Sequence, residues 1–120
     1  MKLFCFYREV GREIVHFDSR RLIQAPLAKL SAPAHISCMY LEAGGVIGLH
    51  QATIPQLFAV VEGEGWVQGK SGERIPIQKG QAVYWEAGEW HETTTDSGLT
   101  AIVIELELAD FDPGAWMPAC

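Results

Sequence analysis

The chain has 120 residues, of which 48% are hydrophobic and 20% charged, and its formal net charge is −6. This length suits one domain with its own core and is too short for two. The acidic balance argues against nucleic acid or an anionic membrane surface as a partner, because no cluster of Lys and Arg is present to neutralise phosphates. No apolar run approaches the length of a membrane span.

The three cysteines are Cys5, Cys38 and Cys120, and no CxxC pair occurs. An odd number with this spacing predicts neither a disulfide framework nor a zinc–thiolate site. The first residues become charged too soon to resemble a signal peptide. We therefore expect a cytoplasmic protein.

The first third of the chain is β-prone but irregular. Residues 3–7 and 13–17 are short apolar runs. Residues 20–30 carry Pro26, which disfavours a helix interior, so they predict an edge strand with a break. Residues 34–42 predict a further strand.

From Gly44 onward, glycines separate short apolar runs. A strand over 56–62 should end in a tight turn at 63–65. The next two runs predict a hairpin around residues 70–72, with arms 65–69 and 73–78. Pro76 in the second arm predicts an edge position for that arm.

Residues 99–108 show the cleanest period-2 alternation. One face carries Ile102, Ile104, Leu106 and Leu108, and the other carries Val103, Glu105 and Glu107. No stretch of helical length has a helical period. Many short strands with regular turn signals predict an all-β sandwich or barrel.

Each of two glycine-bounded stretches carries one histidine at a defined offset. His50 shares a strand face with Ala52, because side chains alternate along a strand. A turn then leads to Gln56, which opens the next strand, and His91 follows a second turn at residues 87–88. If both stretches pair in one barrel, His50, Gln56 and His91 converge at one end.

The first stretch resembles the first motif of the cupin superfamily, G-x5-H-x-H-x3/4-E-x6-G. Gly44, His50 and Gly63 fall on this motif, whereas Ala52 replaces its second histidine and Gln56 its glutamate.

The second stretch resembles the second cupin motif, G-x5-P-x-G-x2-H-x3-N. Gly80, Gly88 and His91 fall on it, with Glu86 in place of proline and Thr95 in place of asparagine. The resemblance implies a double-stranded β-helix, a jelly-roll barrel. It divides a single cupin domain, 1–120, into extra N-terminal strands (1–40), a barrel (41–108) and a tail (109–120).

Three histidines and one glutamate hold a divalent metal in a full cupin site. The resemblance therefore implies that His50, Gln56 and His91 hold Zn, Fe, Mn, Ni or Cu here, with open positions for a small organic ligand. The alternative is a metal-free pocket, in which the two histidines bond to Gln56 or Thr95. Phe58, Trp90 and Thr95 are the expected pocket residues.

The superfamily resemblance implies several possible functions, because a fold does not determine an activity. Dioxygenase or isomerase chemistry is the first expectation, and a non-catalytic binding or sensing module is the alternative. The extra N-terminal strands have edges that need covering, which favours a homodimer. His16 and His35, in the same segment, are expected to be structural or exposed.

Overall fold

The structure, a computed structural model, describes residues 1–107 and 111–120, and this part of the chain contains no α-helix. No helix in it is long and apolar enough to cross a membrane. Its strands and three short 3-10 helices follow in chain order as β1 (Lys2–Cys5), η1 (Arg8–Val10), β2 (Arg12–Glu13), η2 (His16–Asp18), β3 (Ile23–Gln24), β4 (Ala34–Leu41), β5 (Val46–Gln51), β6 (Gln56–Gly69), β7 (Arg74–Gln78), β8 (Gln81–Trp85), β9 (Trp90–Thr94), β10 (Leu99–Leu106) and η3 (Pro113–Ala115).

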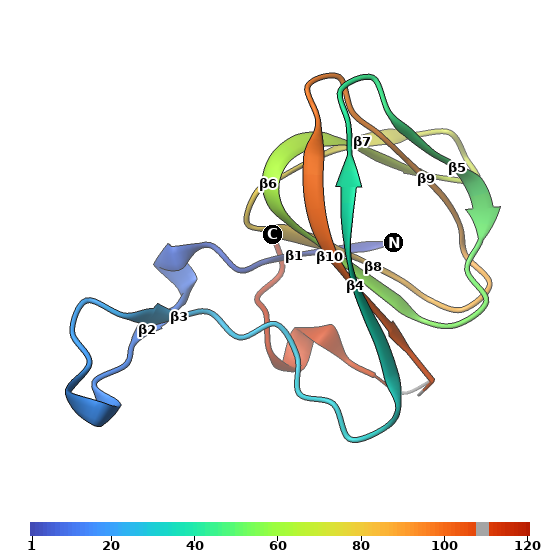
Figure 1. Cartoon of the computed structure of the whole chain (residues 1–120). Helices are drawn as coiled ribbons and strands as arrows, with labels where there is room; N and C mark the ends of the chain where they lie inside the picture. The colour runs from blue at the N-terminus through green and yellow to red at the C-terminus, as the bar shows by residue number, and fades with distance from the viewer. Residues whose placement is uncertain (108–110) are drawn as a thin grey trace.

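Two walls of antiparallel strands form a barrel (Figure 1). One wall has the order β1-β8-β6-β10-β4. In the other wall, β9 pairs with β5 on one side and with β6 on the other, and β6 also pairs with β7. The long β6 belongs to both walls, which are thereby joined. The predicted all-β, double-stranded β-helix fold is confirmed.

The turn predicted at residues 63–65 is wrong, because β6 runs through it without a break. Gly63 has φ of +81°, and the β6–β10 register shifts between Thr100 and Ala101. A Cβ at position 63 would collide with the carbonyl oxygen of Gly98. The extra residue at this shift is Val61, two positions before Gly63, and a bulge beside a left-handed glycine bends a strand without ending it, so β6 can pass from one wall to the other.

The sheet that contains β10 is buried on both faces. The inner core consists of Ala52, Phe58, Val60, Val67, Ile77, Val83, Trp85, Leu99, Ala101 and Val103. The outer core consists of Phe4, Leu57, Ala59, Ala82, Tyr84, Ile104, Leu106 and Met117. The alternation predicted for residues 99–108 is confirmed up to Leu106, and Leu108 lies outside the described residues. Both faces are apolar because terminal segments cover the outer one.

The predicted strands at 13–17 and 20–30 are wrong in extent. Only β2 and β3 form there, and they pair with each other in a hairpin that projects from the barrel (Figure 1). None of residues 8–24, which we call the arm, is buried, and Phe17 is fully exposed. Alternation shows which residues can form a strand, but it does not show whether a sheet edge lies within reach.

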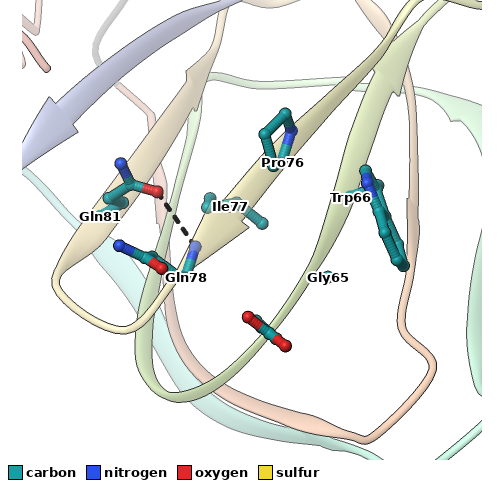
Figure 2. Close-up of a pocket in the computed structure, with 7 residues that line it drawn as sticks. Gly65, Trp66, Pro76, Ile77, Gln78 and Gln81 are labelled. Atoms are coloured by element: carbon teal, nitrogen blue, oxygen red, sulfur yellow. Dashed lines mark hydrogen bonds between the residues drawn. The ribbon is translucent and has the colours of Figure 1, made fainter.

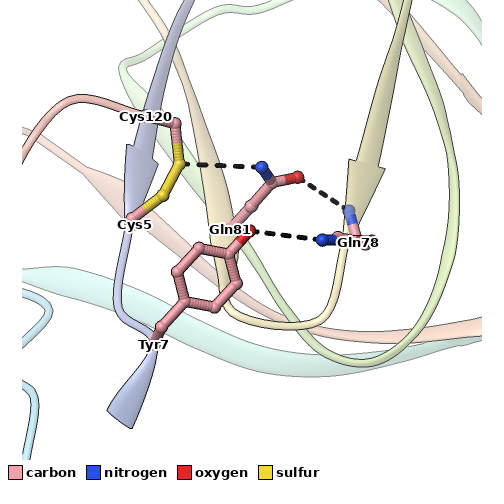
Figure 3. Close-up of a disulfide and its surroundings, with 5 residues drawn as sticks. All are labelled: Cys5, Tyr7, Gln78, Gln81 and Cys120. Carbon is pink, nitrogen blue, oxygen red and sulfur yellow. Dashed lines mark hydrogen bonds between the residues drawn. A yellow bond between two sulfur atoms is a disulfide. The ribbon is translucent and has the colours of Figure 1, made fainter. Parts of the chain in front are cut away.

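A disulfide joins Cys5 in β1 to Cys120, which corrects the expectation of no disulfide (Figure 3). Beside it, Gln81 Nε2 lies 3.7 Å from Cys120 Sγ. The two cysteines are 115 residues apart, and Phe4 and Ala119 form a β-bridge that brings them together. Sequence spacing contains no sign of this bridge. Cys38 is free and exposed.

The edge position predicted from Pro76 is confirmed. Among the described strands, β7 pairs only with β6, and Pro76 lies opposite Trp66 in that ladder. The free edge tolerates a residue without an N–H donor.

Candidate functional site

His50 and His91 lie opposite each other on β5 and β9. Their ring centroids are 4.3 Å apart and the rings meet edge to face at 63°. A register shift between Ile47 and His50 inserts one extra residue into β5, which places His50 on the inward side before Ala52. His91 is buried, with 3% of its surface exposed, whereas His50 is exposed. The fold thus pairs one deep and one accessible imidazole.

Both imidazole rings direct the same nitrogen at a backbone carbonyl. His50 Nδ1 lies 2.7 Å from the oxygen of Gly48, and His91 Nδ1 lies 3.4 Å from the oxygen of Glu89. A carbonyl oxygen only accepts, so each Nδ1 carries the proton and donates it. The Nε2 atoms then keep their lone pairs free, which is the tautomer a metal ligand needs.

The surroundings of His91 favour its neutral form. Burial lowers the pKa of His91, and the nearby His50 lowers it further, against a weaker opposite effect of Glu89. Trp85 stacks on the ring with centroids 4.8 Å apart. A neutral imidazole held flat against an indole is fixed in orientation before any ligand binds.

Gln56 lies at the start of β6, half-buried at the same end of the barrel. It is opposite Trp85 on β8, and Trp85 in turn stacks on His91. Gln56 alternates into the face of Phe58 and Val60, which belong to the inner core. The side chain of Gln56 therefore points into the barrel on the wall that faces the two histidines.

The residue at the second histidine position of the motif contributes packing. Ala52 is buried, its N–H donates to the oxygen of Glu89, and its oxygen accepts from Gly88 N–H. These bonds hold the turn before His91. Two imidazole nitrogens and an amide oxygen suit a divalent transition metal and leave positions open. Within the described residues, no three His, Cys, Asp or Glu side chains cluster closely enough for a metal, so such a site needs Gln56.

The three expected pocket residues take up separate places. Phe58 is part of the packed inner core. Trp90 alternates away from His91, is 37% exposed and has Lys70 Nζ 6.0 Å from its ring centre. Thr95 follows the opposite end of β9, where its hydroxyl donates to the oxygen of Glu64 and accepts from Gly98 N–H.

Glu105 is a polar residue at this end of the barrel that sequence reasoning did not select. It lies on β10 opposite Gln56, and its Oε1 is 3.9 Å from Nδ1 of His35 on β4. The signal was present in the alternation, which put Glu105 on one face with Val103. Only the structure shows that this face is the barrel interior.

A separate cavity of about 310 Å³ lies between β6 and β7 (Figure 2). Trp66 and Pro76 line it, together with Gln78, whose N–H donates to Gln81 Oε1. Because Trp66 alternates with the inner-core Val67, this cavity is on the outer surface of the barrel and does not include the histidines.

The barrel and its two glycine–histidine stretches define a cupin. A sequence model of the Cupin domain family matches residues 37–106, and this chain belongs to that family. An (R)-mandelonitrile lyase from Granulicella tundricola is 31% identical over 98 residues, which make up 80% of this chain and 72% of that protein.

Solved structures of other proteins share the fold. A predicted oxalate decarboxylase from Thermotoga maritima has a TM-score of 0.56 and 24% identity over 61% of this chain. The match covers 65% of that protein, less than two thirds. A cupin superfamily protein from Desulfitobacterium hafniense has a TM-score of 0.58 and 14% identity, with 73% of this chain and 80% of that one covered. At these identities the likeness shows the fold alone.

Proposed function

We propose that this chain is a metal-dependent cupin enzyme that acts on a small oxygen-bearing organic molecule at the barrel mouth. His50, Gln56 and His91 hold the metal. The observation that carries this proposal is the pair of facing imidazoles whose Nδ1 atoms both point at carbonyl oxygens. That arrangement leaves two Nε2 lone pairs as donors on the inward side.

The donor set suits Zn, Fe, Mn, Ni or Cu, since imidazole binds all of these. When bound, the metal supplies positive charge beside a substrate oxygen. Trp85 keeps water from one face of His91, and the lowered pKa of His91 keeps its imidazole neutral. The exposed His50 leaves its side of the mouth open to substrate.

For the reaction, we propose cleavage of a carbon–carbon bond next to an oxygen-bearing carbon. The support is the mandelonitrile lyase relative, whose name denotes a reaction of this type. With a cyanohydrin, the bond to the nitrile carbon breaks, cyanide leaves with the electron pair, and the hydroxyl proton is released as the carbonyl forms. No oxidant is required. Dioxygenase and isomerase reactions are the comparison assays.

We also propose that the enzyme is a homodimer. No residue of the arm is buried against its own chain, and Phe17 is fully exposed. On the barrel, β4 pairs only with β10 among the described strands and exposes Ile36 and Tyr40. A free sheet edge beside exposed apolar side chains favours a protein contact that shields both from water. The arm of a second copy can supply this contact, because its side chains are also apolar and exposed.

The test is elemental analysis of protein purified without an affinity tag, followed by assays with racemic mandelonitrile and with oxalate. The expected result is near-stoichiometric transition metal and release of benzaldehyde or carbon dioxide. The opposite result is protein that takes up none of the five metals and turns over neither compound.

A metal-free binding module is the second candidate, and the replacement of the motif histidine by Ala52 favours it. In that case metabolites should raise the melting temperature equally with and without a chelator. A stabilisation that depends on added metal contradicts this candidate.

A further inference from the structure

Glu105 and His35 face the barrel mouth and are not among the three proposed metal ligands. Glu105 lies opposite Gln56 across the β10–β6 ladder and opposite His35 across the β10–β4 ladder. The Glu105 carboxylate is half-buried, with 31% of its side chain exposed, whereas His35 is 79% exposed. One carboxylate thus lies between the proposed amide ligand and a solvated imidazole.

The alternation of side chains along β10 shows which way the Glu105 carboxylate points. Ile104 and Leu106 belong to the outer core, and Val103 belongs to the inner core. Glu105 alternates with the first two, so its side chain points inward beside that of Gln56. Directly opposed residues of an antiparallel pair have Cβ atoms about 4.5–5.5 Å apart, so a rotation of the two side chains can bring the carboxylate and the amide together.

Gln56 needs such a neighbour, because its amide has two different ends. The oxygen can bind a metal, whereas the NH2 group is a donor and cannot. A carboxylate only accepts hydrogen bonds, so it binds the NH2 end and leaves the oxygen free on the other side. The inward carboxylate also places a negative charge near a site whose three donors are neutral.

We propose that Glu105 is a positioning residue: it accepts a hydrogen bond from Gln56 Nε2 and so turns Gln56 Oε1 toward His50 and His91. This inference rests on the metal site proposed above. Glu105 acts through Gln56, since within the described residues it makes no metal-sized cluster with the histidines. The glutamate of the cupin motif is then replaced by two residues, an amide at position 56 and a carboxylate on the neighbouring strand.

The experiment is an absorption titration of the metal-free protein with Co²⁺, which reports both affinity and ligand geometry without any turnover. Glu105→Gln should weaken Co²⁺ binding about 10–100-fold, the range seen when outer-shell partners of metal ligands are changed. Glu107→Gln is the matched control, because Glu107 is an exposed glutamate just past the end of the same strand. His35→Gln should also bind as the native protein does.

The exchanged pair Gln56→Glu with Glu105→Gln supplies the decisive comparison. It again has one carboxylate and one amide on the two strands, so Co²⁺ affinity should return to near the native value. Loss in Glu105→Gln without recovery in the exchanged pair overturns the positioning role, and so does native binding by Glu105→Gln. If the native protein binds no Co²⁺, the metal site itself fails and the role of Glu105 fails with it. If Glu105→Gln does not fold, Glu105→Thr is used in its place, because threonine favours a β-strand.

Discussion

His50 and His91 meet across β5 and β9 with their ring centroids 4.3 Å apart, and each ring has its Nδ1 at a backbone carbonyl. The backbone therefore sets the tautomer of both rings. As a consequence, both Nε2 atoms have a free lone pair for a ligand before any metal is bound.

Replacing either histidine by alanine should abolish the proposed metal binding. His50→Ala and His91→Ala each leave at most two protein donors of the proposed site, which we expect to lower metal occupancy below a tenth of the native value and to abolish the proposed lyase activity. Elemental analysis checks the occupancy. His16→Ala, in the exposed arm, is the control and should retain both properties. Full occupancy in both site variants would show that the metal lies elsewhere.

The stability of the metal-free protein should fall as the pH falls. The pKa of His91 is lowered in the folded state by burial and by His50, whereas the unfolded chain protonates near its ordinary value of about 6.5. Below that pH the unfolded state binds more protons, so the free energy of unfolding decreases until the folded pKa is passed. Chemical denaturation of chelated protein between pH 7.5 and 5 measures this, and His91→Gln should show a flatter profile.

Gly63→Ala should destabilise the barrel far more than Gly72→Ala. Both glycines have φ of +81°, but a Cβ at Gly63 meets backbone of Gly98, whereas a Cβ at Gly72 meets nothing within 4 Å. An alanine in the left-handed region costs roughly 1–2 kcal/mol by itself, which Gly72→Ala isolates. The difference between the two melting temperatures therefore measures the backbone collision. Equal losses would mean that β6 does not pass so close to residue 98.

Removing the disulfide should lower stability by about 2–4 kcal/mol, the usual range for a bridge that closes a long loop. Cys5→Ser with Cys120→Ser, compared with Cys38→Ser as the control, shows this in denaturant titrations. Mass spectrometry of protein alkylated at lysis tests the expected cytoplasmic location as well. Disulfides are rare in reducing compartments, so an oxidised pair in cells would count against the cytoplasm.

Phe17→Asp should convert the proposed dimer to a monomer, because a charge on the arm cannot enter an apolar contact without a partner. Tyr40→Asp on β4 should do the same from the other side. Light scattering after size exclusion measures the mass. Asp18→Asn, beside Phe17, is the matched control, and a native protein that is already monomeric would contradict the proposal.

Much of the fold was predictable because it depends on local patterns. The alternation of residues 99–106 follows from the period of a strand, and the edge position of β7 follows from the missing N–H of Pro76. The spacing of the two glycine–histidine stretches predicted that His50 and His91 lie close together. Gln56 was selected by its place in the first motif.

The errors came from relations between distant segments. Gly63 and Gly65 predict a turn by residue type, but the pairing with β10 makes them a bend within one strand. The arm has strand-like residues, but it has no neighbouring edge in its own chain. The disulfide depends on two ends that meet only after the barrel has formed.

The amino-acid sequence by itself determined the all-β fold class and the family, and it singled out His50 and His91 as candidates, since side-chain alternation and motif spacing are local properties of a chain. Tertiary structure alone decided that Cys5 meets Cys120, that Trp85 stacks on His91 and that Glu105 stands beside Gln56. These neighbours come from strands far apart in sequence, and their contact depends on register and on the bend of β6. A one-residue change of register would turn each of these side chains to the opposite face, so sequence spacing could not reveal them.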